Sequence, residues 1–125
     1  GAVTATTLST FSAGIVVNDS TGGVAKIETG GSISVADDAT VALSTSNCNS
    51  SFINVYETAS GNGGVFWITY SGAAVLVASS GPVAATDSDT NMCVYKSAGS
   101  HTATFKNRLG ATKTFKIAQI GGTLL

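Results

Sequence analysis

Charged residues are scarce in this sequence. Only 10% of its 125 residues are charged, and the net charge is −1, whereas roughly a quarter of the residues are charged in ordinary soluble proteins. A nucleic-acid-binding protein needs a strongly basic surface, so this balance argues against nucleic acid as a partner. Ser, Thr, Gly and Asn supply the missing polarity. Long charged side chains are depleted at protein interfaces, so such a surface suits a chain that packs against copies of itself.

The residue types used in catalysis and metal binding are equally few. His101 is the only histidine, and Glu28 and Glu57 are the only glutamates. There is no Gly-x-Ser-x-Gly elbow, and no His/Cys spacing suits zinc. The run DSDTN at 87–91 has alternating oxygens that calcium could use, but a turn whose side chains bond the backbone is the commoner use of such residues. We therefore expect no enzymatic activity, no metal and no cofactor.

Cysteine, proline and long apolar runs are also nearly absent. The two cysteines, Cys48 and Cys93, do not make a disulfide framework; a single bridge and two buried thiols both stay open, and buried thiols are the commoner state. The only proline, Pro82, lies between two expected strands. No apolar run approaches the roughly 18 residues of a membrane-spanning helix, so we expect no membrane span.

The sequence does contain a succession of short β-branched and aromatic runs. They are separated by clusters of Gly, Asn, Asp and Ser, and their spacing of about 8–12 residues is typical of a sandwich or barrel. No 3.6-residue apolar period occurs. The pattern predicts an all-β fold for residues 14–125, an antiparallel β-sandwich that is jelly-roll-like. The expected strands are 14–18, 24–28, 32–35, 40–43, 52–57, 65–70, 74–78, 91–96, 102–106 and 112–120.

The stretch VFWITY at 65–70 is apolar on both faces of its expected strand, whereas FINVYE at 52–57 alternates. A small sandwich buries only one face of each sheet. The second face of this strand is therefore covered by another copy of the chain or by a long loop of its own chain. We expect the first, with a subunit interface at Phe66, Trp67, Ile68 and Tyr70.

Four of the six positive charges lie within residues 105–117: Lys106, Arg108, Lys113 and Lys116. The alternation predicts a hairpin of 102–106 and 112–120, with a turn at 107–110 and Gly110 in the left-handed conformation. The lysines would then lie on the solvent face of a two-stranded ribbon, where charge discourages aggregation. In an assembly about a threefold axis, the grouped copies would instead offer an anion contact, weakly attractive to anionic glycans.

Three stretches, FKNRLGATKTFKIAQIGG, SVADDATVAL and NMCVYKSAGSHTATF, resemble the C-terminal regions of tailed-phage fibre, head-fibre and capsid decoration proteins. In those regions a strand, an Asn-x-x-Gly turn, a Thr/Lys-rich strand and a terminal Ile-Gly follow one another. The resemblance covers most of residues 14–122. It implies a homotrimeric β-sandwich knob displayed on a virion. The N-terminus departs from the family because it has no shaft or collagen-like repeat, which favours a compact decoration protein or a separate knob.

Residues 1–13, GAVTATTLSTFSA, are too weakly apolar for a core strand and too β-prone for a flexible linker. We expect an extended N-terminal arm that pairs with the edge of a neighbouring chain and docks on the particle through Leu8 and Phe11; a frayed terminus is the alternative.

The predicted function is that of a phage virion structural protein. It would be a homotrimer on the particle surface that decorates or stabilises the capsid or forms a fibre tip, in contact with other virion proteins such as the major capsid protein. The alternative is the receptor-binding knob of a tail fibre, recognising a cell-surface glycan. Trp67 favours the structural role, because it lies in the middle of an expected strand rather than at a tip.

Overall fold

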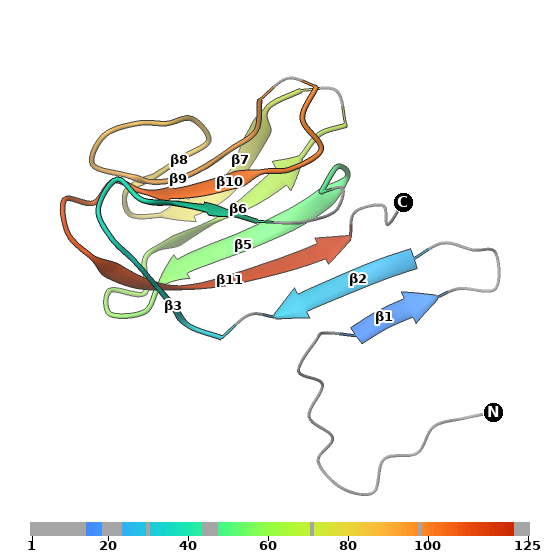
Figure 1. Cartoon of the computed structure of the whole chain (residues 1–125), viewed down its shortest axis with the longest axis horizontal. Helices are drawn as coiled ribbons and strands as arrows, with labels where there is room; N and C mark the ends of the chain where they lie inside the picture. Colours follow the sequence, from blue (N-terminus) through green and yellow to red (C-terminus); the bar gives the residue numbers. More distant parts are fainter. Residues whose placement is uncertain are drawn as a thin grey trace, which may run out of the picture.

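The computed structural model describes residues 15–18, 24–29, 31–43, 48–70, 72–97 and 99–121. This part of the chain forms eleven strands and no helix, and its two sheets pack against each other (Figure 1). The expected all-β sandwich is thereby confirmed. The jelly-roll topology stays a prediction, and the N-terminal arm lies outside the described residues. Among those residues, no helix is long and apolar enough to cross a membrane.

The larger sheet is antiparallel, and six of its strands follow one another across it. Their order is β1 (Ile15–Asn18), β2 (Val24–Thr29), β11 (Lys113–Gly121), β5 (Ser51–Glu57), β6 (Gly63–Ile68) and β7 (Ala74–Ser80). The short strand β3 (Ile33–Val35) pairs with the beginning of β11. A bulge interrupts the pairing of β6 with β7 between Val65 and Phe66, so that Val77 has no direct partner.

The smaller sheet has the order β4 (Thr40–Ala42), β10 (Thr104–Asn107), β9 (Met92–Tyr95) and β8 (Val83–Ala84). Each of the ten expected strands is present, with ends that differ by at most two residues. The extra strand, β8, pairs in parallel with β9. It spans two residues, which is too short for a period-2 pattern to be visible in the sequence.

The expected hairpin of residues 102–106 and 112–120 is wrong. β10 pairs with β4 and β9, whereas β11 pairs with β2, β3 and β5, so residues 108–112 cross from one sheet to the other. Phe105 and Phe115 explain the crossing, because both are fully buried and their ring centroids lie 4.7 Å apart. The two strands pack face to face instead of side by side. Gly110 does have the expected positive φ, 79°.

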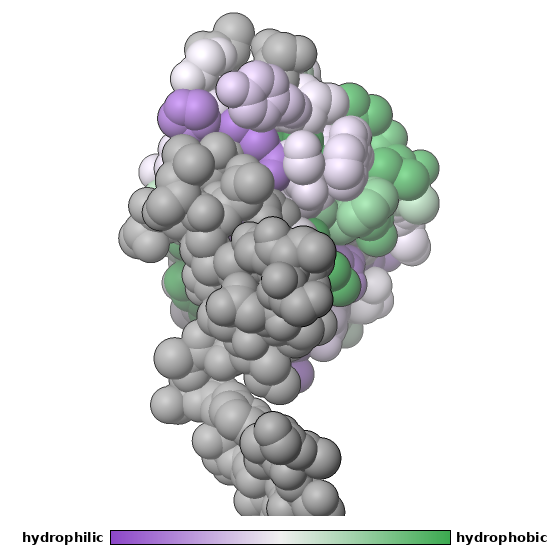
Figure 2. All heavy atoms as spheres, turned by 90° about the vertical axis from the view of Figure 1, so that its right-hand side faces the viewer, coloured by the Kyte–Doolittle hydropathy of each residue, from purple (hydrophilic) through white to green (hydrophobic). Residues whose placement is uncertain are grey.

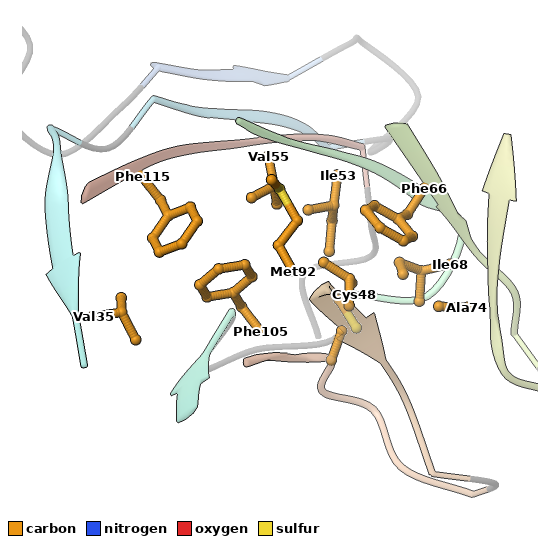
Figure 3. Packing of buried hydrophobic residues seen from close by; sticks show 12 residues of the cluster. Val35, Cys48, Ile53, Val55, Phe66, Ile68, Ala74, Met92, Phe105 and Phe115 are labelled. Carbon is orange, nitrogen blue, oxygen red and sulfur yellow. The ribbon is translucent and has the colours of Figure 1, made fainter. Parts of the chain in front are cut away.

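The core lies between the two sheets. In β5 and β6, buried residues alternate with more exposed ones, as expected for strands with one covered face. Figure 3 shows Met92 and Phe105 pointing from the smaller sheet toward Val55 and Phe115 of the larger one. Each such side chain contributes about 1.5–3 kcal/mol when it leaves water. Cys48 and Cys93 are buried free thiols, so the two cysteines do not form the single bridge left open above.

Candidate functional site on the outer face of the larger sheet

The outer face of the larger sheet carries a line of apolar residues. Ile120 of β11 pairs with Phe52 of β5, and Phe52 pairs on its other side with Trp67 of β6. Trp67 in turn pairs with Val75 of β7. Directly paired residues of antiparallel strands point to the same face. Four neighbouring strands therefore contribute one side chain each to a continuous line, which we call the apolar row.

The apolar row is open to solvent. Phe52 is 45% exposed, Val75 48% and Ile120 55%, while Trp67 is half-buried beside Phe52, with ring centroids 4.8 Å apart. Val77, at the bulge of β7, is another exposed apolar residue, with 56% of its surface open to solvent. Scattered exposed apolar residues are ordinary, but a contiguous patch indicates an interaction surface. Figure 2 shows hydrophobic residues gathered on one side of the described part of the molecule.

The described line of residues next to the apolar row carries no charge. The adjoining line across the same four strands consists of Ala118, Asn54, Val65 and Ala78. The next residue of β11 on this face, Lys116, pairs with Tyr56 one line further away. A partner that docks on the row therefore meets an apolar and uncharged polar surface.

Of the four residues expected at a subunit interface, two are accessible on the surface and two are buried in the core. Trp67 belongs to the apolar row, and Tyr70, 72% exposed, follows the end of β6. Phe66 and Ile68 are fully buried, which corrects the expectation that they contact another subunit. Successive residues of a strand point to opposite faces, and the core of the same subunit covers the inner one. Sequence reasoning also missed Phe52, Val75 and Ile120.

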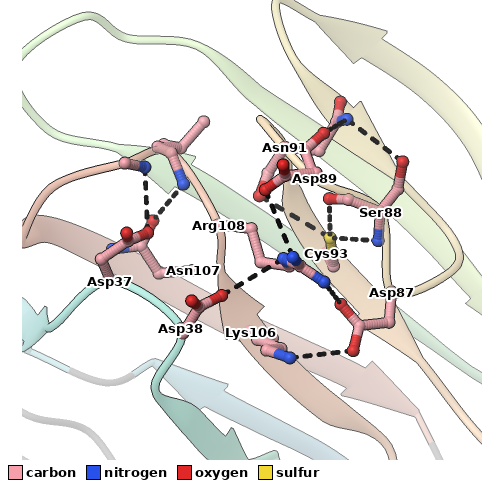
Figure 4. Close-up of polar contacts among 12 residues, drawn as sticks. Asp37, Asp38, Asp87, Ser88, Asp89, Asn91, Cys93, Lys106, Asn107 and Arg108 are labelled. Carbon is pink, nitrogen blue, oxygen red and sulfur yellow. Dashed lines mark hydrogen bonds and ion pairs between the residues drawn. The ribbon is translucent and has the colours of Figure 1, made fainter.

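The basic residues of the 105–117 stretch do not form one patch within the subunit. Lys106 Nζ lies 2.9 Å from a carboxylate oxygen of Asp87, and Arg108 Nη1 lies 2.9 Å from the other oxygen (Figure 4). These two cations are neutralised by their own chain. Lys113 and Lys116 are three positions apart in β11 and so point to opposite faces of the sheet.

Arg108 is the centre of an ion-pair cluster that joins three segments. Its guanidinium lies 3.2 Å from Asp38 and 3.3 Å from Asp89, in addition to the contact with Asp87. Hydrogen bonds from Lys106 and Arg108 hold the pKa of the Asp87 carboxyl below its ordinary value. Asp87 in turn raises the pKa of Lys106 and of Arg108. The cluster fixes the crossing between the sheets to the loops at 36–38 and 87–91.

The run at 87–91 forms a turn of the expected kind, with Asn91 Nδ2 donating to the carbonyl of Asp89 at 2.7 Å. Within the described residues, no group of three or more His, Cys, Asp or Glu could hold a metal ion. Asp87 and Asp89 both face the Arg108 guanidinium. Their carboxylates are therefore used in ion pairs of the subunit.

The other polar side chains that could take part in catalysis or binding also make contacts within the subunit. Asn49 Nδ2 lies 3.1 Å from Nδ1 of His101. Lys96 is 5% exposed and donates to the carbonyls of Thr69 at 2.8 Å and Tyr70 at 3.2 Å, tying the end of β9 to the end of β6. Burial raises the pKa of both cysteine thiols, which disfavours the reactive thiolate.

Neither the models of protein families, nor the curated proteins, nor the solved structures contain a match to this chain. The candidate site is thus defined by its own geometry, an exposed and uncharged apolar row on one face of a sandwich.

Proposed function

We propose that this chain is a structural protein of the tailed-phage virion, a homotrimeric β-sandwich that decorates or stabilises the capsid or forms a fibre tip. The observation that carries the proposal is the apolar row of Ile120, Phe52, Trp67 and Val75. A sandwich with a complete core gains nothing within its own fold by exposing such a row. The sequence resemblance of residues 14–122 to virion knobs supports the same role.

A second copy of the chain is the occupant that we assign to the row. The row and its adjoining line are uncharged, and only 10% of the whole chain is charged. Two copies therefore approach without the like-charge repulsion that suppresses wrong partners. Copies of one chain also meet at a fixed ratio and in closed symmetry, which is the usual arrangement of soluble oligomers.

The size of this face indicates that it is one part of a larger interface. Six strands that each occupy about 4.8 Å of the width of the sheet and are roughly 20 Å long present a face of about 580 Å² in projection. Stable protein pairs bury about 800 Å² per partner. The outer face therefore provides a substantial share of the contact, and a second surface has to complete it.

The assembly is tested by the molar mass in solution. Size-exclusion chromatography with light scattering is expected to give three times the 12.4 kDa of the chain. Phe52→Asp and Ile120→Asp introduce a charge into the row and are expected to yield monomers that keep their β-sheet circular dichroism. Ala42→Asp, at an exposed position of β4 in the other sheet, is the matched control. A wild-type chain that is monomeric at every concentration contradicts the proposal.

The location is tested by immunogold labelling of the phage particles that contain the chain. Gold is expected on the outer surface of the capsid or at a fibre tip. Label that appears only after the particles are broken open would contradict a role on the particle surface.

A receptor-binding knob is the second candidate, and one observation favours it. Tyr70 is 72% exposed and lies two residues after the end of β6, and exposed aromatic rings present apolar faces to sugars. A glycan array is the test. Binding of the wild type that Tyr70→Ala abolishes, without change in molar mass, would support this candidate over a purely structural role.

A further inference from the structure

Among the described residues, no strand pairs with the outer edge of β7, the last strand of the larger sheet. Among the described residues its one strand partner is β6, and residues 74–80 make no hydrogen bond outside that pairing. Natural edge strands are usually protected by charges, by proline or by a covering segment. The sequence of β7, AVLVASS, has neither charge nor proline. Five of its seven residues are exposed, so the strand can accept a further strand.

We infer that this edge receives residues 2–13 of a neighbouring copy as an added strand, so that each subunit of the homotrimer donates its N-terminal segment to the next. The inference rests on the function proposed above, because it supposes the homotrimer. The donated segment, AVTATTLSTFSA, has no charge and no proline and is rich in Thr and Val, the composition of a strand. Strand addition obtains affinity from main-chain hydrogen bonds and specificity from alternate side chains.

The apolar anchors of the segment match the two sides of the edge. Leu8 and Phe11 are three positions apart, so in a strand they point to opposite faces. The outer side of β7 offers Val75, where the apolar row ends. The inner side offers Leu76, which is half-buried and packs against the core. An added strand therefore prolongs the row on one side and covers the core on the other.

A neighbouring copy fits this edge better than the same chain does. β1 and β7 lie at opposite ends of the strand order, five spacings or about 24 Å apart. An extended chain that runs back from Ile15 needs about seven residues to cover this distance. Leu8 and Phe11 would then lie in the crossing segment, and only residues 1–7 would reach β7.

The symmetry also selects the donated segment over a pairing of β7 with a second β7. Such a pairing is two-fold and produces dimers. A segment that enters a different surface on the next copy makes a heterologous contact, which closes into a ring when the rotation permits. The added strand also supplies contact beyond the outer face, which alone is smaller than a stable interface.

A mixing experiment on the full chain distinguishes donation from self-pairing. One variant carries Thr10→Cys and a second carries Ser79→Cys, whereas the native Cys48 and Cys93 are fully buried and react slowly. The two variants are mixed, left to exchange subunits and treated with a short bismaleimide. A covalent dimer is expected in the mixture and in neither variant alone. A third variant carries both substitutions in one chain. If the mixture gives no covalent dimer and this third variant cross-links only within its own chain, the inference is overturned.

An edge substitution provides the second test. Val77→Lys puts a charge on β7, and Thr40→Lys does the same on β4, an edge strand of the smaller sheet and an exposed control. Val77→Lys is expected to raise the dissociation constant of the trimer by about tenfold or more, and Thr40→Lys to leave it unchanged, with both variants folded by circular dichroism. A monomeric wild type defeats the proposed function as well. A trimer that depends on Phe52 and Ile120 but tolerates Val77→Lys overturns this inference alone.

Discussion

At the scale of single residues, one buried amide holds the crossing between the sheets in place. Asn107 is fully buried at the end of β10, and its Nδ2 donates to the carbonyls of Val35 at 2.9 Å and Ala111 at 2.8 Å. Its Oδ1 accepts a hydrogen bond from the backbone N–H of Leu109. The side chain thus ties the end of β3, the turn at 108–111 and its own strand together.

We predict that Asn107→Ala lowers the free energy of unfolding by about 1–3 kcal/mol, because buried polar groups lose their partners. Thr40→Ala, at an exposed position of β4 in the other sheet, is expected to change it by less than about 0.5 kcal/mol. Urea unfolding measures both. Equal effects would mean that the buried amide has no special role.

A second residue-scale prediction concerns the backbone at Gly110. A Cβ at this position would meet no atom within 4 Å, but φ is +79°, so any cost of substitution is conformational. Gly110→Val is expected to destabilise the protein by about 1–3 kcal/mol. A Cβ at Gly31 would also meet no atom within 4 Å, and Gly31 has no positive φ. Gly31→Val is therefore the matched control and should lower the stability by less than Gly110→Val. Thermal unfolding compares the two; a larger loss for Gly31→Val would contradict the assignment of strain.

At the scale of strands, the sequence predicted the elements, but it predicted neither every pairing nor, in β6, that Phe66 and Ile68 face the core. Strand positions follow from local alternation, and all the expected strands are present. The pairing of β10 with β11 failed because alternation shows only that Phe105 and Phe115 are buried. It does not show whether they lie beside each other in one sheet or face each other across the core, as they do.

The ion-pair cluster around Arg108 connects strands and loops, and it makes stability depend on pH. The pKa of Asp87 is lowered in the folded protein, so its contribution is present above the ordinary aspartate value of about 4. The contribution is lost as the pH falls through the lowered folded value. The pKa of Lys106 is raised, so its contribution is present below about pH 10.4 and is lost as the pH rises through the folded value.

We predict that Asp87→Asn lowers the melting temperature at pH 6, where the wild-type carboxyl is charged, and that this effect becomes smaller toward pH 2, because protonation of the carboxyl removes the charge that its partners stabilise. Melting curves between these pH values measure the difference. Asp89→Asn is the control in the same loop, because Asp89 is 80% exposed while Asp87 is 40% exposed, and solvent weakens exposed ion pairs. A difference between Asp87→Asn and the wild type that is the same at both pH values would rule out a charge effect.

At the scale of the whole molecule, the candidate site could be predicted only in part. The stretch at 65–70 indicated an apolar second face, and Trp67 lies on that face. The other members of the row, Phe52, Val75 and Ile120, come from three further strands, and their alignment depends on the register of the sheet. Register is a non-local property, set by which faces are buried and by the turns. In the sequence, Phe52, Val75 and Ile120 are each one apolar residue among several in their strand. Nothing in the sequence therefore indicated that they align across the sheet.

Substitutions at the adjacent residues Phe66 and Trp67 distinguish an effect on folding from an effect on assembly. Phe66 is fully buried in the core, so Phe66→Ala is expected to cost about 3–5 kcal/mol of stability. Trp67 lies on the outer face, so Trp67→Ala is expected to act mainly on assembly. Unfolding of a trimer is linked to its dissociation, and its midpoint rises with protein concentration. Phe66→Ala should lower the midpoint at every concentration and keep this dependence, whereas Trp67→Ala should abolish it. Thermal unfolding over a hundredfold range of protein concentration, with light scattering in parallel, measures the midpoint and its dependence on concentration. A Trp67→Ala protein that keeps the wild-type concentration dependence would exclude the apolar row as a subunit contact.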